Sequence, residues 1–462
     1  MPAQLTEHDL FDSPDPKSFA ACASSAEINL VRYARRLGGD ESFGKEIGRI
    51  FLERHGMDDA GKIPVYGQAE KRRIMSLNSH LKESDLLVCR EGRPYYIAGS
   101  ALSRRDHLVT NPEQLYVPFE FTTSYAGART YNRRSRDWWP FDIPVGGGYM
   151  DNVIYDGLPR HEVDLGNGKF GLSSAKPKPF PFYGATSRLS LPDILGATGS
   201  APTVAAPFLA DVLGFPEFQH TAPGNLPGLR TRELLHTDGG AIDNLGLMPL
   251  LARGVKNILV FYNTPSPYNP GHMPGEIGHV FGKSKQHGIL AHFDQELARM
   301  NHVIDDPKGI QAAEMVASFD KAFLARKAMV HTGTYRIRNN SYHSIKGGNV
   351  VNIVWVILGP AGVLKPETAP DPEASPTLVT APTMQLEETI WFNSLKPDLQ
   401  AKLRQNPELK NFPHYKTFLN NGRRIIDLTP LQVNTLAHYT SYAVQINATK
   451  IKSFLNISGG AH

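Results

Sequence analysis

The sequence contains few cysteines, no long apolar run and no N-terminal targeting signal. Cys22 and Cys89 are the only cysteines in 462 residues, too few for a disulfide framework or a cysteine-rich metal site. We therefore expect the reducing environment of the cytoplasm. No segment reaches the roughly 18 uninterrupted apolar residues of a membrane-spanning helix, and the first residues do not resemble a secretory signal. Any contact with membranes is expected to be peripheral.

The net charge is also small. The chain has 49 Lys and Arg residues against 45 Asp and Glu residues, which gives a formal charge of +4 at neutral pH. A balance this close gives no reason to expect a nucleic-acid partner. The weak basic excess is compatible with an anionic membrane surface.

The length and the composition predict one large globular unit with insertions. The chain has 41 Gly and 35 Pro residues, which imply many turns, and its hydrophobic content of 41% is enough for a sizeable core. We expect an α/β core over residues 1–358 and a proline-rich loop or linker over 359–384. Residues 385–462 are expected to form a helical region that packs on the core.

Apolar periodicity predicts helices and strands in mixed order. The run at 257–264 is apolar and is flanked by turn residues, which is typical of a buried parallel strand. Together with the strand and the helix before it, this run predicts a βαβ unit. The expected helices lie within 25–57, 187–202, 245–253, 283–330 and 385–462, and the expected strands within 85–102, 115–127, 232–238, 257–264 and 347–360.

A strand that ends in His-Thr-Asp-Gly-Gly, residues 236–240, is the most informative part of the chain. A carboxylate at the carboxyl end of a parallel strand projects into the crevice where open α/β sheets bind ligands. Two following glycines permit positive φ and the close approach of a substrate. Asp238 is therefore our candidate for a catalytic base. The alternative is that Asp238 caps the next helical turn and that Gly239 and Gly240 only form a tight turn.

The sequence around Asp238 forms a longer motif that resembles a motif of a known family. The pattern D-G-G-x-x-x-N-x-G-x-x-P at 238–249 resembles the second active-site motif of the patatin-like and cytosolic phospholipase A2-like acyl hydrolases. The strand pair YYIAGSAL and VPFEFTTSYAG is similar to a strand pair of that family. SLPDILGATGSAP at 190–202 resembles its helix and small-residue turn, with Thr198 where serine is usual. The matched segments follow the family's order over roughly residues 43–262.

The resemblance implies an α/β fold with a mostly parallel central sheet and helices on both faces. It also implies a lipid acyl-ester hydrolase, in which a serine attacks the carbonyl of a glycerolipid or phospholipid and Asp238 takes the serine proton. Such a Ser/Asp dyad uses no cofactor and no metal, and its substrate is reached at a membrane surface.

The nucleophile of this dyad is not evident in the sequence. The family carries a G-x-S-x-G elbow and a glycine-rich oxyanion loop, and neither motif occurs here. Ser24 is the nearest candidate, although a capping box with Glu27 explains it equally well. Ser100 also has small neighbours, but the resemblance assigns it to a non-catalytic strand. Either the chain is N-terminally incomplete, or it is an inactive hydrolase-fold protein that binds lipid or a partner chain.

Two other clusters have a structural and a functional interpretation. His279, His287 and His292 lie near Asp294 in the sequence, which invites a metal site, but their spacing favours packed or solvated histidines. The arginines at 133–136 precede two tryptophans and could meet lipid phosphates at an interface, or form a solvated cluster.

Overall fold

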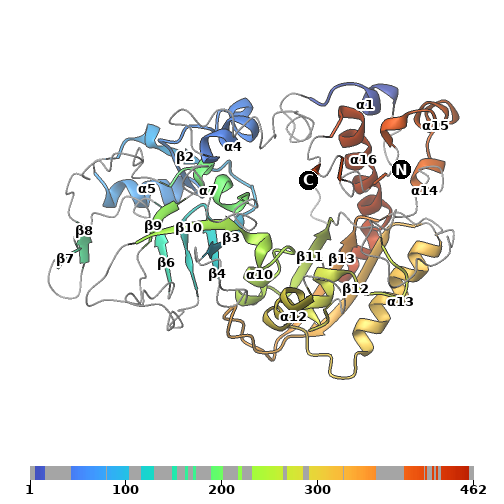
Figure 1. Cartoon of the computed structure of the whole chain (residues 1–462). Coiled ribbons are helices and arrows are strands. Elements are labelled where there is room, and N and C mark those ends of the chain that lie inside the picture. Colours follow the sequence, from blue (N-terminus) through green and yellow to red (C-terminus); the bar gives the residue numbers. More distant parts are fainter. Residues whose placement is uncertain are drawn as a thin grey trace.

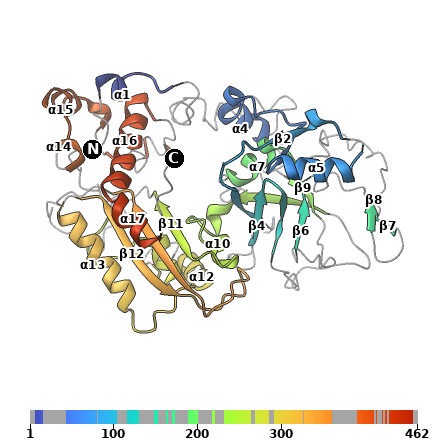
Figure 2. The same cartoon turned by 180° about the vertical axis from the view of Figure 1, so that it is seen from behind.

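The computed structural model describes the chain in separate stretches. These are residues 6–15, 43–79, 81–103, 116–129, 148–152, 162–164, 170–172, 189–200, 217–220, 232–263, 268–284, 291–325, 327–359, 390–409, 412–413, 419–420, 423–424 and 428–456. In Figures 1 and 2 their elements form two groups, one around a six-stranded sheet and one around a three-stranded sheet. Helix α1 (Glu7–Phe11) packs beside the C-terminal helix α16 (Pro430–Ile446) in the second group.

The larger sheet is antiparallel throughout. Its strand order is β6-β5-β4-β3-β10-β9, and every neighbouring pair runs in opposite directions. The strands are β3 (Ile97–Ser103), β4 (Tyr116–Thr122), β5 (Tyr125–Ala128), β6 (Gly148–Asp151), β9 (Glu217–His220) and β10 (Arg232–Asp238).

The expectation of a mostly parallel central sheet is therefore wrong. Among the described strands, parallel pairing occurs only between β1 (Ile63–Val65) and β2 (Leu86–Val88), and between β11 (Asn257–Tyr262) and β13 (Val350–Ile357). Apolar runs indicate which faces are buried, but they do not fix the direction in which strands pair. β4 and β5 are joined by two residues only, a connection that antiparallel strands allow and parallel strands do not.

One face of the antiparallel sheet packs against helix α7 (Leu191–Thr198), which the sequence predicted. The helix begins at Ser190, whose hydroxyl accepts the backbone N–H of Asp193 in a capping box. α7 also packs against α4 (Phe43–Phe51), where Gly48 lets the Pro192 ring approach closely. The apolar residues of this layer include Leu102, Phe119, Phe121, Leu189, Ile194, Ala197 and Phe218.

The second sheet has the order β11-β13-β12, with β12 (Met329–Arg336) antiparallel to β13. Figures 1 and 2 show helices on both of its faces. One face packs on α10 (Met248–Ala252), α11 (Gly275–Val280) and α13 (Ile310–Leu324), and the other on α17 (Ala448–Phe454). The indole of Trp355 is fully buried in the first of these layers.

The predicted succession of strand, turn, helix and strand is present as β10, a 3-10 turn, α10 and β11. It is not a βαβ unit, because β10 belongs to the antiparallel sheet and β11 to the other. β11 is parallel to its neighbour as expected, but it is an edge strand of its sheet and only one of its faces is buried. Leu259 and Phe261 on the other face are 36% and 46% exposed.

The C-terminal helices enclose a separate apolar cluster. Trp391, Phe392 and Phe412 pack there with Leu10 of α1. The other elements of the described stretches are α5 (Gln68–Leu77), α12 (Ala291–Met300), α14 (Ile390–Asn393), α15 (Pro397–Arg404), β7 (Glu162–Asp164), β8 (Phe170–Leu172), β14 (Leu419–Asn420), β15 (Arg423–Arg424) and 3-10 turns at Glu53–His55, Glu83–Asp85, Gly239–Ala241 and Pro407–Leu409.

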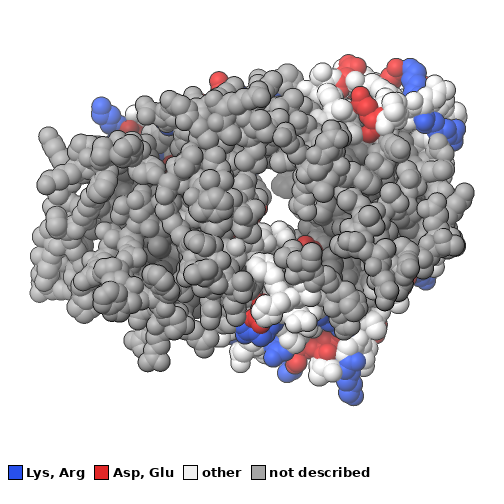
Figure 3. All heavy atoms as spheres, in the orientation of Figure 1, with Lys and Arg blue, Asp and Glu red and all other residues white. Residues whose placement is uncertain are grey.

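Charged side chains of both signs lie together on the described surface. Figure 3 shows them at the upper right, over α1 and α15, where Lys402 forms an ion pair with Glu7. Within the described stretches no helix combines the length and the apolar character needed to cross a bilayer.

Candidate functional site

Asp238 is the last residue of β10, at a point where the chain turns sharply. It lies opposite Ser100 of β3 in the sheet register and is followed by the 3-10 turn Gly239–Ala241. One carboxylate oxygen, Oδ1, accepts the backbone N–H of Gly240 at 2.8 Å. The aspartate therefore caps the turn, as the structural alternative predicted. The cap occupies one oxygen, and Oδ2 has no partner among the described residues.

The environment of Asp238 raises the pKa of its carboxyl above the value of an exposed aspartate. The residue is half-buried, and desolvation by burial raises the pKa of its carboxyl. The N–H of Gly240 opposes this shift, but it is the smaller effect. A carboxylate with a raised pKa is a better proton acceptor than an exposed one.

Close packing requires the first glycine of the motif. A Cβ on Gly239 would lie 2.5 Å from the carbonyl oxygen of Gly99, so the turn could not rest on β3. A Cβ on Gly240 would meet side-chain atoms alone, the nearest being Oδ1 of the exposed Asn244 at 2.3 Å, which can move aside. Gly239 thus allows the turn to sit directly on the sheet, which holds Asp238 in place.

We expect Gly239→Ala to destabilise the protein by about 2 kcal/mol, because backbone atoms must move to admit the methyl group. The free energy of unfolding from urea denaturation measures this effect. Gly99→Ala is the matched control, because a Cβ there has nothing within 4 Å. Equal stability of the two variants would contradict the packing argument.

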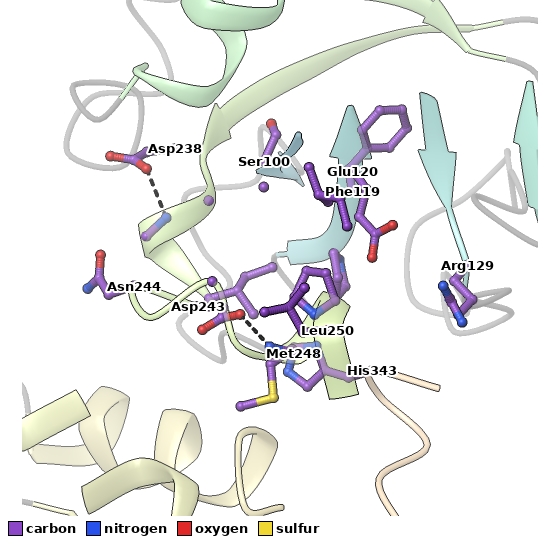
Figure 4. A pocket seen from close by; sticks show the side chains of 18 of the residues that line it. Ser100, Phe119, Glu120, Arg129, Asp238, Asp243, Asn244, Met248, Leu250 and His343 are labelled. Carbon is purple, nitrogen blue, oxygen red and sulfur yellow. Dashed lines mark hydrogen bonds between the residues drawn. The ribbon is translucent and has the colours of Figure 1, made fainter. Parts of the chain in front are cut away.

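A cavity of about 400 Å³ lies beside this turn (Figure 4). One wall is the sheet face that carries Ile97, Pro118 and Glu120, and the other is the segment 238–250. The volume is in the range of small-molecule sites, and the lining combines apolar residues with several polar and charged ones. In Figure 4 the Asp238 carboxylate lies on the other side of the turn from Glu120 and Arg129. Asp238 is thus at one edge of the cavity.

Asp243 fixes the segment that forms the second wall. Its Oδ1 accepts the N–H of Leu245 at 3.1 Å and its Oδ2 accepts that of Met248 at 2.9 Å. Burial raises the pKa of this carboxyl, and these N–H groups oppose the shift. Asp243 is therefore a structural residue at the start of α10. In the sequence, the position of Asp243 shortly before an apolar helical run indicates this capping role.

A polar cluster forms the end of the cavity near β4. Glu120 accepts two hydrogen bonds from the Arg253 guanidinium, at 3.1 and 2.6 Å, and one from the Tyr149 hydroxyl at 2.9 Å. Arg129 donates to Tyr149 Oη at 3.0 Å and to the carbonyl of Ala252 at 2.9 Å. The cluster brings a cation, Arg129, to the cavity wall. In the sequence, the only sign of this polar cluster is Glu120, a single acidic residue within the apolar strand 116–122.

His343 enters the cavity from a loop that the sequence did not single out. Its ring is 7% exposed, and Nε2 lies 2.7 Å from Oδ1 of Asn301. Asn301 in turn donates its amide to the carbonyl of Ile242 at 2.6 Å, which ties this loop to the turn after Asp238. Burial lowers the pKa of His343 to about 3, so the ring is neutral at physiological pH.

Ser100, which lies in the described part of the chain, does not hydrogen-bond to Asp238. Ser100 is 3% exposed, and its hydroxyl donates to the carbonyl of Thr237 at 2.9 Å and lies 3.2 Å from Nδ1 of His236. The hydroxyl of Ser100 therefore links β3 to β10. Ser24 lies outside the described residues. Thr198 hydrogen-bonds within its own helix, to the carbonyl of Leu195.

Of the other sequence candidates, His279 and Asp294 are paired, His292 on α12 is exposed, and the rest lie outside the described stretches. His279 and Asp294 form a pair at 2.8 Å that joins α11 to α12. Within the described stretches no group of three or more potential ligands could hold a metal ion. His287 and the Arg-Trp segment 133–139 are outside these stretches.

No model of a known protein family matches this chain. No curated protein matches it either. The interpretation of the site therefore rests on the motif and on its geometry.

Proposed function

We propose that this protein is a lipid acyl-ester hydrolase in which Asp238 acts as the general base. The observation that carries the proposal is the position of this carboxylate. It is half-buried at the edge of a cavity lined by apolar and polar residues, with one oxygen anchored by Gly240 and the other without a described partner. The pattern at 238–249, which resembles an acyl hydrolase motif, adds support.

The chemistry requires one nucleophile and one base. A serine oxygen bonds to the ester carbonyl carbon while its proton passes to the Asp238 carboxylate. When the carbonyl re-forms, the ester C–O bond breaks and the leaving alkoxide takes the proton from Asp238. Water then repeats the two steps and releases the acid. Our candidate for the serine remains Ser24, because the hydroxyl of Ser100 is directed to a backbone carbonyl.

The cavity suits an acyl lipid as the substrate. Apolar residues of both walls, among them Ile97, Met248 and Leu250, can contact an acyl chain. Arg129 supplies a positive charge for the phosphate of a phospholipid. We propose a glycerolipid or phospholipid reached at a membrane surface.

Hydrolysis of fluorogenic acyl esters together with fluorophosphonate labelling tests this function. We expect turnover above the buffer rate and covalent labelling of one serine, which peptide mapping then identifies. Ser100→Ala is the control and should keep both turnover and labelling. Absence of turnover and of labelling on short-chain and long-chain esters would refute the proposal.

A second function is favoured by one observation. No hydroxyl of the described residues hydrogen-bonds to Asp238, so its role as a cap could be its whole role. The protein would then bind a lipid or a partner chain without hydrolysing an ester. Lipid binding without labelling or turnover would support this alternative.

The activity should depend on pH through Asp238, which must be ionised to accept a proton. Burial raises its pKa above the ordinary value of 3.8, so we expect the acid limb of kcat/KM to lie above pH 3.8. The stability of the fold depends on pH in the opposite direction to the activity. A raised pKa in the folded state stabilises the fold at low pH, and this contribution is lost as pH rises through the raised value.

A pH profile of kcat/KM and urea denaturation at several pH values check this prediction. In Asp238→Asn the stability contribution that depends on this ionisation should disappear, while the rest of the pH dependence remains. An acid limb at or below pH 3.8 would contradict the assignment of Asp238 as the base.

A further inference from the structure

The His343 ring is held in one tautomer by its neighbours. The side-chain amide of Asn301 donates to the carbonyl of Ile242, so its Oδ1 faces His343 as an acceptor. His343 Nε2 must then carry the proton and donate it. A neutral imidazole with Nε2 protonated has a bare lone pair on Nδ1. The lowered pKa of His343 agrees with this neutral form.

This lone pair has no partner among the described residues. The backbone N–H of His343 is used separately, because it donates to Oδ1 of Asn340 at 3.1 Å. The ring is 7% exposed, and it lines the cavity. Figure 4 shows it well apart from the Asp238 carboxylate. Nδ1 is not among the fully buried atoms that lack a partner, so water can reach it in the free protein. A ligand that covers Nδ1 without donating a hydrogen bond would leave it unpaired, which is costly, whereas a ligand that donates one avoids this cost.

We propose that His343 is a specificity-determining residue whose Nδ1 accepts a hydrogen bond from a free hydroxyl of the bound lipid. The inference deepens the proposed function, on which it rests for the choice of ligand class. It selects glycerolipids that retain a hydroxyl over lipids in which every hydroxyl is esterified or alkylated. Asn301 is the positioning residue that fixes the tautomer, because its Oδ1 accepts from Nε2 and leaves Nδ1 as the acceptor.

Ether lipids test this inference without any hydrolysis. Binding of 1-O-octylglycerol and of its 2,3-di-O-methyl ether to the full chain is measured by isothermal titration calorimetry. The methylated lipid keeps the oxygen acceptors and the alkyl chain but has no hydroxyl to donate. We expect the free diol to bind at least about 10-fold more tightly than the methylated lipid. This ratio corresponds to the cost of leaving one polar group unpaired in the complex.

Two variants assign the preference to His343. His343→Phe removes the acceptor and should bind both lipids with similar affinity. His343→Gln keeps a donor for Asn301 and an acceptor oxygen, and should restore part of the preference. The matched control is His331→Phe, because His331 is a half-buried histidine on β12 whose pKa burial also lowers, to about 4, but it does not line the cavity.

The outcomes separate this inference from the proposed function. Equal affinity of the wild-type protein for the two lipids, or no binding of either, would overturn the inference even if acyl esters are hydrolysed. A hydroxyl preference that disappears in His343→Phe and remains in His331→Phe would support it even if no ester is turned over. If His343→Phe fails to fold by circular dichroism, the wild-type comparison and His343→Gln decide.

Discussion

Replacing Asp238 by asparagine is expected to lower kcat/KM for acyl esters by about 10²- to 10⁴-fold, the range that a general base contributes. Asparagine has the same shape, and its amide oxygen can still accept the N–H of Gly240, so the turn should persist. An amide oxygen cannot take the proton of a serine at neutral pH. The loss should therefore appear in kcat, with little change in KM.

The measurement is steady-state hydrolysis of a fluorogenic acyl ester by wild-type protein and variants of equal thermal stability. Asp320→Asn is the matched control, because Asp320 accepts a hydrogen bond from Tyr268 and does not line the cavity. It should hydrolyse the ester at the wild-type rate. A turnover of Asp238→Asn within tenfold of wild type would exclude Asp238 as the base.

Local features of the site could be read from the sequence because they depend on short stretches of chain. The strand before Asp238, the turn after it and the helix that follows are all present at the predicted positions. Close packing of Gly239 on β3 explains why the motif needs glycine. The capping of α7 by Ser190 is likewise a local pattern that the sequence reveals.

The arrangement of the sheets could not be read in the same way. The strands β3, β4, β10, β11 and β13 were recognisable by their apolar residues, whereas β1, β6, β9 and β12 were not predicted. Even for a recognised strand, the partner is set by contacts with distant segments. β10 pairs with β3, more than a hundred residues earlier, and β11 pairs with β13. The parallel sheet was inferred from a resemblance, and the strands of the larger sheet instead pair as antiparallel neighbours.

The polar residues of the cavity were missed for the same reason. Glu120 and Arg253 are separated by 133 positions, and neither occurs in a motif that indicates their pairing. His343 lies in a loop whose nearest polar partners, Asn301 and Asn340, are unremarkable in the sequence. Single polar residues in apolar or loop segments are common, so only the folded structure reveals which of them meet.

Replacing Arg253 by methionine is expected to destabilise the protein by about 3 kcal/mol, because it leaves the Glu120 carboxylate without its cation in a mostly buried site. The side chains of Arg253 and Glu120 are 19% and 11% exposed, and their closest atoms are 2.6 Å apart. Arg253 follows α10 and Glu120 lies on β4, so the pair joins the segment that follows Asp238 to the antiparallel sheet. Tyr149 still donates to Glu120 in the variant, but a neutral hydroxyl cannot replace the charge.

A double-mutant cycle separates the pair from the packing of either side chain. Urea denaturation of Arg253→Met, Glu120→Gln and the double variant gives three changes in the free energy of unfolding. We expect the double variant to be less destabilised than the sum of the single ones, because removing both charges leaves no uncompensated ion. The hydrogen bonds of Arg253 to Pro249 and Tyr125 are lost in Arg253→Met and in the double variant alike, so they cancel in the cycle.

Additive changes, or a cost of Arg253→Met below about 0.5 kcal/mol, would show that the pair contributes no more than an exposed surface ion pair. The cavity wall would then be held by apolar packing, and Glu120 would be free to interact with a ligand.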